Sequence, residues 1–212
     1  MLLYPGFTML DLVGPMTVFA MHSNVRLLWK TLQPVNSDSS GVAILPNTTL
    51  AACPKLDVLF VPGGVGTSAA MRDAELIEFL KETGVSASYV TSVCSGSLIL
   101  GAAGLLDGYK ATTHWAAHER LRDVGAVPVK ARVVEDRNRF TGGGVTAGID
   151  FGLTLLAKLR GEEEAQVAQL MMEYAPEPPF NAGTPDAASP EIVNLVRAIL
   201  DQAAASSQMA VR

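Results

Sequence analysis

Cysteine, histidine and clustered positive charge are all scarce in this sequence of 212 residues. Its two cysteines are too few for a disulfide framework, and no group of His, Cys, Asp and Glu has the spacing of a metal site. The formal net charge is −5, with no run of Lys or Arg, so the electrostatic footprint of a nucleic-acid or membrane-surface binder is missing. We expect no metal, no nucleic acid and no membrane as partners.

Long apolar segments are absent too. The longest apolar stretch, residues 98–106, is about half of the roughly 18 residues that a membrane-spanning helix needs. The first residues lack the basic region and the longer apolar region of a secretory signal. We therefore expect a cytoplasmic protein.

The overall composition is typical of a well-buried globular protein. Apolar residues make up 49% of the chain and charged residues 17%. A chain of this length can close around one core. We expect a single domain over residues 1–212, with disorder confined to a tail at about 206–212.

Two strand-to-helix changes stand out in the first half of the chain. Residues 56–61 form an almost continuous apolar run ending in Pro62-Gly63-Gly64, which predicts a buried parallel strand. Residues 73–83 have the apolar spacing of a crossover helix with Gly84 as its C-cap. A second strand is predicted at 89–93, followed by a helix at 97–106.

The alternation of strands and helices continues through the rest of the chain. Further elements are expected as strands at 1–4, 25–32, 42–45 and 111–115, a hairpin at 132–141 turning at 136–138, and helices at 116–124, 145–159, 162–174 and 190 to about 205. This order predicts an α/β fold with a doubly wound, mostly parallel sheet. Such sheets place their sites beyond the carboxyl ends of the strands.

Cys94 lies at the second of these strand-to-helix changes. A cysteine there has its sulfur close to free N–H groups of the helix, which favour the thiolate, and small neighbours permit a tight turn. The alternative is a small buried cysteine at a sheet–helix junction. Cys53 has no such helix behind it, so we expect Cys94 to be the thiol that iodoacetamide labels first.

Glycine and histidine residues near other strand ends could line the same crevice. The Gly63 and Gly64 N–H groups could hold a developing negative charge, although a plain turn explains them equally well. Gly142-Gly143-Gly144 lacks a P-loop lysine and indicates close packing. His114 lies at a predicted strand end, where a packing or hydrogen-bonding role competes with catalysis.

Asp11 is an acid embedded in an apolar segment just after the first predicted strand. It could act beside the cysteine, or it could be the N-cap of a helix that starts near Pro15. Composition alone does not separate these two interpretations.

Six segments together resemble the DJ-1/PfpI superfamily, and within it the isocyanide hydratase-like branch. They are YPGFTMLDLVGP at 4–15, PGG at 62–64, TSVCSGSL at 91–98, ATTHWA at 111–116, TGGGVTAGIDF at 141–151 and EYAPEPPFNAG at 173–183. The glycine and cysteine motifs are shared across the superfamily. The first and last segments are more particular to the hydratase-like branch.

The resemblance implies a flavodoxin-like (class I glutamine amidotransferase-like) fold, a homodimer and no cofactor. It makes Cys94 the nucleophile and Asp11 its acidic partner, with Ser95 where the branch usually has threonine. We place Gly63, Gly64, His114 and Val145 in the substrate pocket. Protease-like members have histidine directly after the cysteine, and the serine here argues against peptide hydrolysis.

The activity that the resemblance implies is a lyase reaction: hydration of an isocyanide to an N-substituted formamide through a thioimidate on Cys94. Two rivals remain open, a glyoxalase or deglycase that uses the same cysteine, and a non-enzymatic redox or ligand sensor. Similar domains also occur in AraC-type transcription regulators. Those continue into a DNA-binding domain, whereas one helix follows Pro190 here, so we expect no DNA-binding role.

Overall fold

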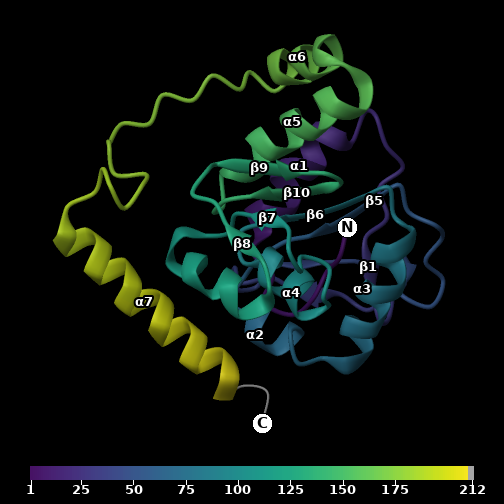
Figure 1. The fold of residues 1–212 in the computed structure, drawn as a ribbon, viewed down its shortest axis with the longest axis horizontal. Coiled ribbons are helices and arrows are strands. Elements are labelled where there is room, and N and C mark those ends of the chain that lie inside the picture. Colours follow the sequence, from purple (N-terminus) through teal and green to yellow (C-terminus); the bar gives the residue numbers. More distant parts are fainter. Residues whose placement is uncertain (210–212) are drawn as a thin grey trace.

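The computed structural model describes residues 1–209 (Figure 1). Its helices are α1 (Met9–Phe19), α2 (Thr67–Ala70), α3 (Ala74–Ser86), α4 (Gly96–Ala102), the 3₁₀ helix η1 (Trp115–Val124), α5 (Ala147–Arg160), α6 (Glu162–Met171) and α7 (Pro190–Met209). Its strands are β1 (Leu28–Trp29), β2 (Val35–Asn36), β3 (Ala43–Ile44), β4 (Thr48–Thr49), β5 (Val58–Val61), β6 (Tyr89–Val93), β7 (Lys110–Ala111), β8 (Val127–Pro128), β9 (Val133–Asp136) and β10 (Arg139–Gly142).

The main sheet has the order β5-β6-β10-β9. β5, β6 and β10 pair in parallel, while β9 and β10 form the antiparallel hairpin that the sequence predicts. The chain start lies beside β5, because Leu2 N donates to Phe60 O at 2.9 Å and Leu3 N donates to Leu28 O at 2.8 Å. The segment expected as a first strand therefore bridges β1 and β5, although only Leu2 forms a bridge there.

Helices cover both faces of this sheet, as expected for a flavodoxin-like α/β fold (Figure 1). On one face α5 packs against β10 and against α1 and α6. On the other, α4 packs against β5, β6, α3 and η1. After α6 the chain runs without regular structure to α7, which lies along the outside of the molecule (Figure 1).

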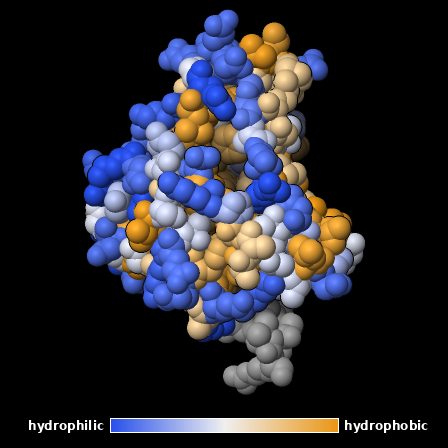
Figure 2. All heavy atoms as spheres, turned by 90° about the vertical axis from the view of Figure 1, so that its right-hand side faces the viewer, coloured by the Kyte–Doolittle hydropathy of each residue, from blue (hydrophilic) through white to orange (hydrophobic). Residues whose placement is uncertain are grey.

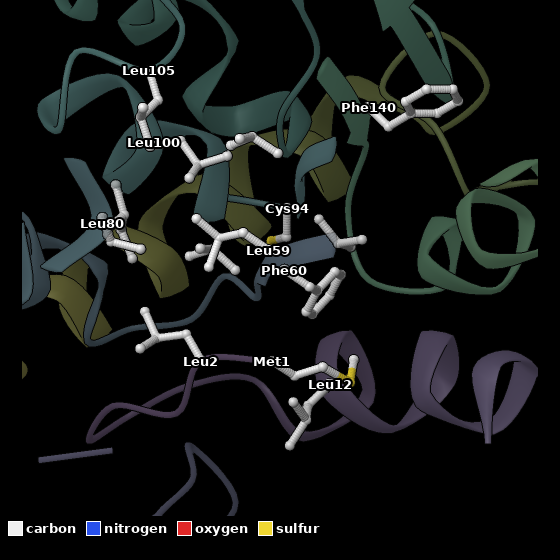
Figure 3. Packing of buried hydrophobic residues seen from close by; sticks show 14 of the residues in the cluster. Met1, Leu2, Leu12, Leu59, Phe60, Leu80, Cys94, Leu100, Leu105 and Phe140 are labelled. Carbon is white, nitrogen blue, oxygen red and sulfur yellow. The ribbon is translucent and has the colours of Figure 1, made fainter. Parts of the chain in front are cut away.

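One buried cluster of apolar side chains joins the two layers. Figure 3 shows Cys94 inside this cluster, together with Leu59 and Phe60 of β5 and Leu12 of α1. The strands end next to Cys94, so the core that holds the sheet together also encloses the candidate nucleophile.

Several element boundaries differ from the sequence-based expectations. The helices expected at 97–106 and 162–174 end at Ala102 and Met171, and the strands expected at 25–32 and 42–45 shorten to β1 and β3. Gly84 lies inside α3 instead of capping it, since a Cβ there would come within 2.6 Å of the Leu105 side chain, so close packing explains the glycine. The strand expected at 111–115 is limited to β7. α7 continues to Met209 instead of ending near 205, and residues 210–212 of the expected disordered tail lie outside the described residues.

A search of the described residues finds no helix that is both long and apolar enough to cross a membrane.

Candidate active site

Cys94 occupies a sharp turn between β6 and α4. Its φ of 55° lies in the left-handed region, which costs a non-glycine residue about 1–3 kcal/mol. Four hydrogen bonds fix the turn: Cys94 N donates to the Gly142 and Gly143 carbonyls, both at 3.0 Å, and Cys94 O accepts from Thr113 Oγ1 at 2.8 Å and Ser97 Oγ at 3.2 Å. The sulfur is therefore presented by a backbone that its neighbours hold in a strained conformation.

The loop after β5 lies directly against this turn. A Cβ on Gly63 would stand 2.6 Å from Ser95 N and 2.7 Å from Cys94 Cβ. On the opposite side, a Cβ on Gly96 would collide with the Val61 carbonyl oxygen. The glycines at these two positions allow the loop and the turn to pack without a gap.

Asp11 lies in the first turn of α1 and is completely buried. Its Oδ2 accepts a hydrogen bond from Gly63 N at 3.0 Å. The N-cap position belongs to Thr8, so the alternative interpretation of Asp11 as a helix cap is wrong. Burial raises the pKa of Asp11 to about 7, while the Cys94 thiol and the Gly63 N–H act in the opposite direction.

Cys94 and Asp11 face each other closely enough for each to shift the pKa of the other. Burial, followed by the negative charge of Asp11, raises the pKa of the Cys94 thiol well above its usual range. The Ser95 N–H lowers it only in part. The Ser95 N–H thus favours the thiolate in the direction that the sequence predicts, but burial and the Asp11 charge together have the larger effect on the pKa.

A chain of hydroxyl groups supports Ser95. Ser95 Oγ accepts from Gly64 N at 3.1 Å and lies 2.7 Å from Thr67 Oγ1, which itself donates to Gly64 O at 2.7 Å. The buried Tyr4 hydroxyl donates to Pro62 O at 3.0 Å and lies 3.3 Å from Thr67 Oγ1. Because Thr67 gives its proton to Gly64 O, it can only accept from Ser95.

These contacts give the Gly63 and Gly64 N–H groups a different task from the one expected. They donate to Asp11 and Ser95. They therefore orient the Asp11 and Ser95 side chains next to Cys94, and they are not free to donate to a negative charge on the substrate.

The expected pocket residues separate into two sets. Gly63 and Gly64 lie with Asp11 and Ser95, whereas His114 and Val145 line a cavity whose walls include neither Cys94 nor Asp11. His114 Nδ1 accepts from Ala116 N at 3.3 Å at the start of η1, and burial lowers the pKa of His114. A neutral, hydrogen-bonding histidine agrees with the structural interpretation of this residue.

The glycine run before α5 packs closely, as the sequence indicates. A Cβ on Gly144 would collide with the His114 ring. Within the described part of the chain, no group of three or more His, Cys, Asp or Glu could hold a metal ion.

Sequence reasoning missed Thr67 and Thr113, which hydrogen-bond Ser95 and Cys94, and Tyr4, whose hydroxyl lies against Thr67. Thr113 belongs to the ATTH segment that the resemblance singled out, so its position at a strand end was a usable signal. Tyr4 likewise begins the segment at 4–15 that the resemblance singled out. Thr67 had no such signal, because its contacts depend on how distant loops meet.

Comparison with known proteins places this chain in context. The DJ-1/PfpI family model matches residues 1–158. A curated isonitrile hydratase from Pseudomonas putida is 53% identical over 198 residues, which cover 92% of this chain and 86% of that protein. The crystal structure of a THiJ/PfpI family protein from Pseudomonas syringae is 51% identical, with a TM-score of 0.90, and covers 97% of this chain and 88% of that one.

More distant relatives divide between regulators and DJ-1 proteins. The HTH-type transcriptional regulator GbdR of Pseudomonas aeruginosa is 32% identical over 182 residues, and the match covers 82% of this chain but 49% of the regulator. The chain thus spans about half the length of that regulator. Drosophila melanogaster DJ-1beta is 24% identical, with a TM-score of 0.73, and shows a shared fold.

Proposed function

This chain belongs to the DJ-1/PfpI family, and from that membership we propose that it is an isocyanide hydratase, a lyase that converts R–N≡C and water into an N-substituted formamide. Isonitrile is another word for isocyanide, so the relative from Pseudomonas putida carries the same activity in its name. The observation that carries the proposal is the buried pair of Cys94 and Asp11, whose carboxyl group has a pKa of about 7.

This pair suits the chemistry of the isocyanide carbon. That terminal carbon has to receive both a proton and a nucleophile before water can replace the nucleophile. A carboxyl group with a pKa near 7 can give and take protons at neutral pH, which an exposed aspartate does poorly. A thiol beside it supplies the nucleophile.

In the first step the ionised Asp11 takes the proton from the Cys94 thiol. The thiolate then attacks the terminal carbon of the isocyanide, and Asp11 returns the same proton to that carbon. One C–S bond and one C–H bond form, and the product is the thioimidate R–N=CH–S–Cys94. No proton is gained or lost overall.

In the second step Asp11, again ionised, takes a proton from water as the water oxygen attacks the thioimidate carbon. The proton passes to the imine nitrogen, and a tetrahedral adduct R–NH–CH(OH)–S–Cys94 results. Its C–S bond breaks as the hydroxyl proton moves through Asp11 to the sulfur. R–NH–CHO leaves and the Cys94 thiol is restored, with no cofactor consumed.

Ser95 stabilises the sulfur while it is negatively charged. Its backbone N–H and its hydroxyl both lower the pKa of the Cys94 thiol. Since the hydroxyl has a single proton, that proton turns from Thr67 Oγ1 to the sulfur when the thiolate forms. The hydroxyl chain through Thr67 limits the orientations that this group can adopt.

The test incubates purified protein with an aryl isocyanide or with methylglyoxal under reducing conditions and identifies the products. Formamide that requires both Cys94 and Asp11 supports the hydratase. Lactate from methylglyoxal without formamide would assign the glyoxalase activity instead. Neither product from folded protein would favour a sensor.

A homodimer and a cytoplasmic location complete the proposal. Ile192, Leu195 and Ile199 recur at helical spacing on the outer side of α7, and 47%, 61% and 55% of their respective surfaces are exposed. Such an apolar stripe on a surface helix suits contact with a second copy of the chain. A reducing cytoplasm would keep the Cys94 thiol free.

A further inference from the structure

A cavity of about 810 Å³ lies next to the Cys94 turn but does not include the reacting pair. Its walls come from residues 112–116, 118–120, 130–132 and 143–147 and from the C-terminal arm, through residues 183–186 and Arg197. Neither Cys94 nor Asp11 is among the lining residues. This volume lies within the range of pockets that bind small organic molecules.

The lining is basic although the whole chain has a formal net charge of −5. Four basic side chains line the cavity, Arg120, Lys130, Arg132 and Arg197, against the acidic side chains of Glu119 and Asp186. The positive charge is therefore concentrated here in an otherwise acidic protein, which favours an anionic ligand.

Existing ion pairs neutralise only part of this charge. Arg132 Nε donates to Asp150 Oδ2 at 2.5 Å, which satisfies that guanidinium. Glu119 forms an ion pair with Arg122, with 3.5 Å between Oε2 and Nε, and Arg122 is not one of the four basic side chains that line the cavity. Arg120 and Lys130 form no ion pair with any residue that the structure describes, and both are exposed. These two cations are available to a ligand.

Aromatic rings form another part of the wall. The Arg197 guanidinium lies 5.0 Å from the centre of the Trp115 ring, and the rings of His114 and Trp115 are 5.5 Å apart. A flat apolar surface of this kind suits the carbon skeleton of a ligand. A bare inorganic ion would leave it unused.

We propose that this cavity is a binding site for small organic carboxylates, separate from the hydratase centre. An organic carboxylate is favoured over inorganic phosphate because the aromatic wall contacts its carbon skeleton and because the glycine run lacks a P-loop lysine. A single carboxylate requires only the two free cations.

A ligand in this site would lie close to the backbone of Cys94, separated from it by Thr113 and Gly143. Thr113 and Gly143 line the cavity and also hydrogen-bond the Cys94 carbonyl and amide. The site therefore adjoins the turn without sharing the sulfur, and binding can be measured independently of turnover.

The experiment follows the two tryptophan indole N–H signals by nitrogen-15 NMR during titration with benzoate. Trp115 lines the cavity and Trp29 does not, so Trp29 is an internal reference. A saturable shift of the Trp115 signal alone, at least about tenfold weaker with the uncharged isostere benzamide, supports the site. No shift, equal binding of benzamide, or equally tight binding of inorganic phosphate would overturn it.

Paired variants test the assigned cations. Arg120→Gln combined with Lys130→Gln should weaken benzoate binding by about tenfold or more, since both charged contacts are lost. Arg72→Gln combined with Lys81→Gln removes the same charge from exposed positions outside the cavity and should leave binding unchanged. Equal behaviour of the two double variants would contradict the proposal. Hydratase activity plays no part in this readout, so its absence would not affect the result.

Discussion

Asp38 Oδ2 accepts a hydrogen bond from the Thr8 hydroxyl at 2.6 Å, which places a second carboxylate at the start of the helix that carries Asp11. Asp38 also lies 3.4 Å from Met9 N and receives the hydrogen bond of that first-turn amide. Its negative charge raises the pKa of Asp11, although burial has the largest effect. Asp38 is therefore a positioning residue that also tunes the acid.

Asp38→Asn should lower the pH at which activity rises. The active form of the pair carries one proton, so kcat/KM should increase as the pH rises through about 7, the pKa of Asp11. Removing the Asp38 charge lowers the pKa of Asp11, so the rise in kcat/KM moves to lower pH. High salt should reduce the difference between variant and wild type, because Asp38 is exposed. A profile that coincides with wild type at low salt would contradict this role.

Asp11→Asn should greatly reduce turnover and stabilise the fold. The folded pKa lies above the unfolded one, so the stability that Asp11 contributes is present below pH 3.8 and is lost as the pH rises through about 7. At about pH 8 Asp11 is ionised and buried in the folded wild type, whereas the amide of the variant carries no charge. Unfolding should then need more free energy, on the order of 3 kcal/mol, allowing for desolvation of the amide. Formamide production should fall by on the order of 100-fold or more.

The measurement is thermal unfolding of both proteins at about pH 5 and pH 8, beside turnover. A gain in stability that is equal at the two pH values would count against a raised pKa. An active Asp11→Asn enzyme would remove Asp11 from the mechanism.

Cys94→Ala should leave no formamide production, because no thioimidate can form.

In the wild type, iodoacetamide should label Cys53 before Cys94 near neutral pH, which reverses the expectation from sequence. Cys94 is 7% exposed and burial raises the pKa of its thiol well above the usual range, whereas Cys53 is only partly buried. Peptide mass spectrometry of the labelled protein checks the order, and Cys53→Ser, which should retain activity, is the control.

Thr67→Val should reduce kcat by about tenfold or less with little change in KM, because the neutral hydrogen bond that orients Ser95 Oγ beside Cys94 is lost. The valine keeps the size of the side chain but cannot accept from Ser95. Thr67→Ser restores the hydroxyl and should recover most of the turnover. If Val and Ser variants behave alike, the hydroxyl chain does not orient Ser95.

Leu195→Glu should shift the protein from dimer to monomer in sedimentation at micromolar concentration. The change puts a charge into the exposed apolar stripe of α7 without touching the core. Figure 2 shows another hydrophobic region at the end of the molecule where α6 lies. The α6 residues Leu170 and Met171 are exposed. Leu170→Glu is therefore the matched control, and a monomeric wild type would contradict the dimer itself.

The sequence was sufficient to predict the site's framework, because local patterns encode it. The change from β-branched to Leu- and Ala-rich residues around Cys94 predicts the turn, and the apolar run before Pro62 predicts β5. Both features depend only on neighbouring residues. The pairing of Asp11 with Cys94 needed the family resemblance, because 83 positions separate them.

What the sequence could not predict depends on contacts between distant segments. Thr67 meets Ser95 because the loop after β5 folds back over the Cys94 turn, and no periodicity in the chain signals this. The state of the Cys94 thiol depends on how many apolar side chains surround it. The residues next to Cys94 in the sequence predict the helix N–H groups that lower the pKa of its thiol. They do not predict the burial that raises this pKa by more.

The near-complete burial of Cys94 also sets a requirement on the shape of any molecule that reaches its sulfur. A narrow, linear group that reacts at its tip can approach through a small opening, whereas a branched electrophile must displace the core around Leu59 and Phe60. An inhibitor for this centre should therefore carry its reactive carbon at the end of a slender rod, such as a nitrile, with its bulk left outside the turn.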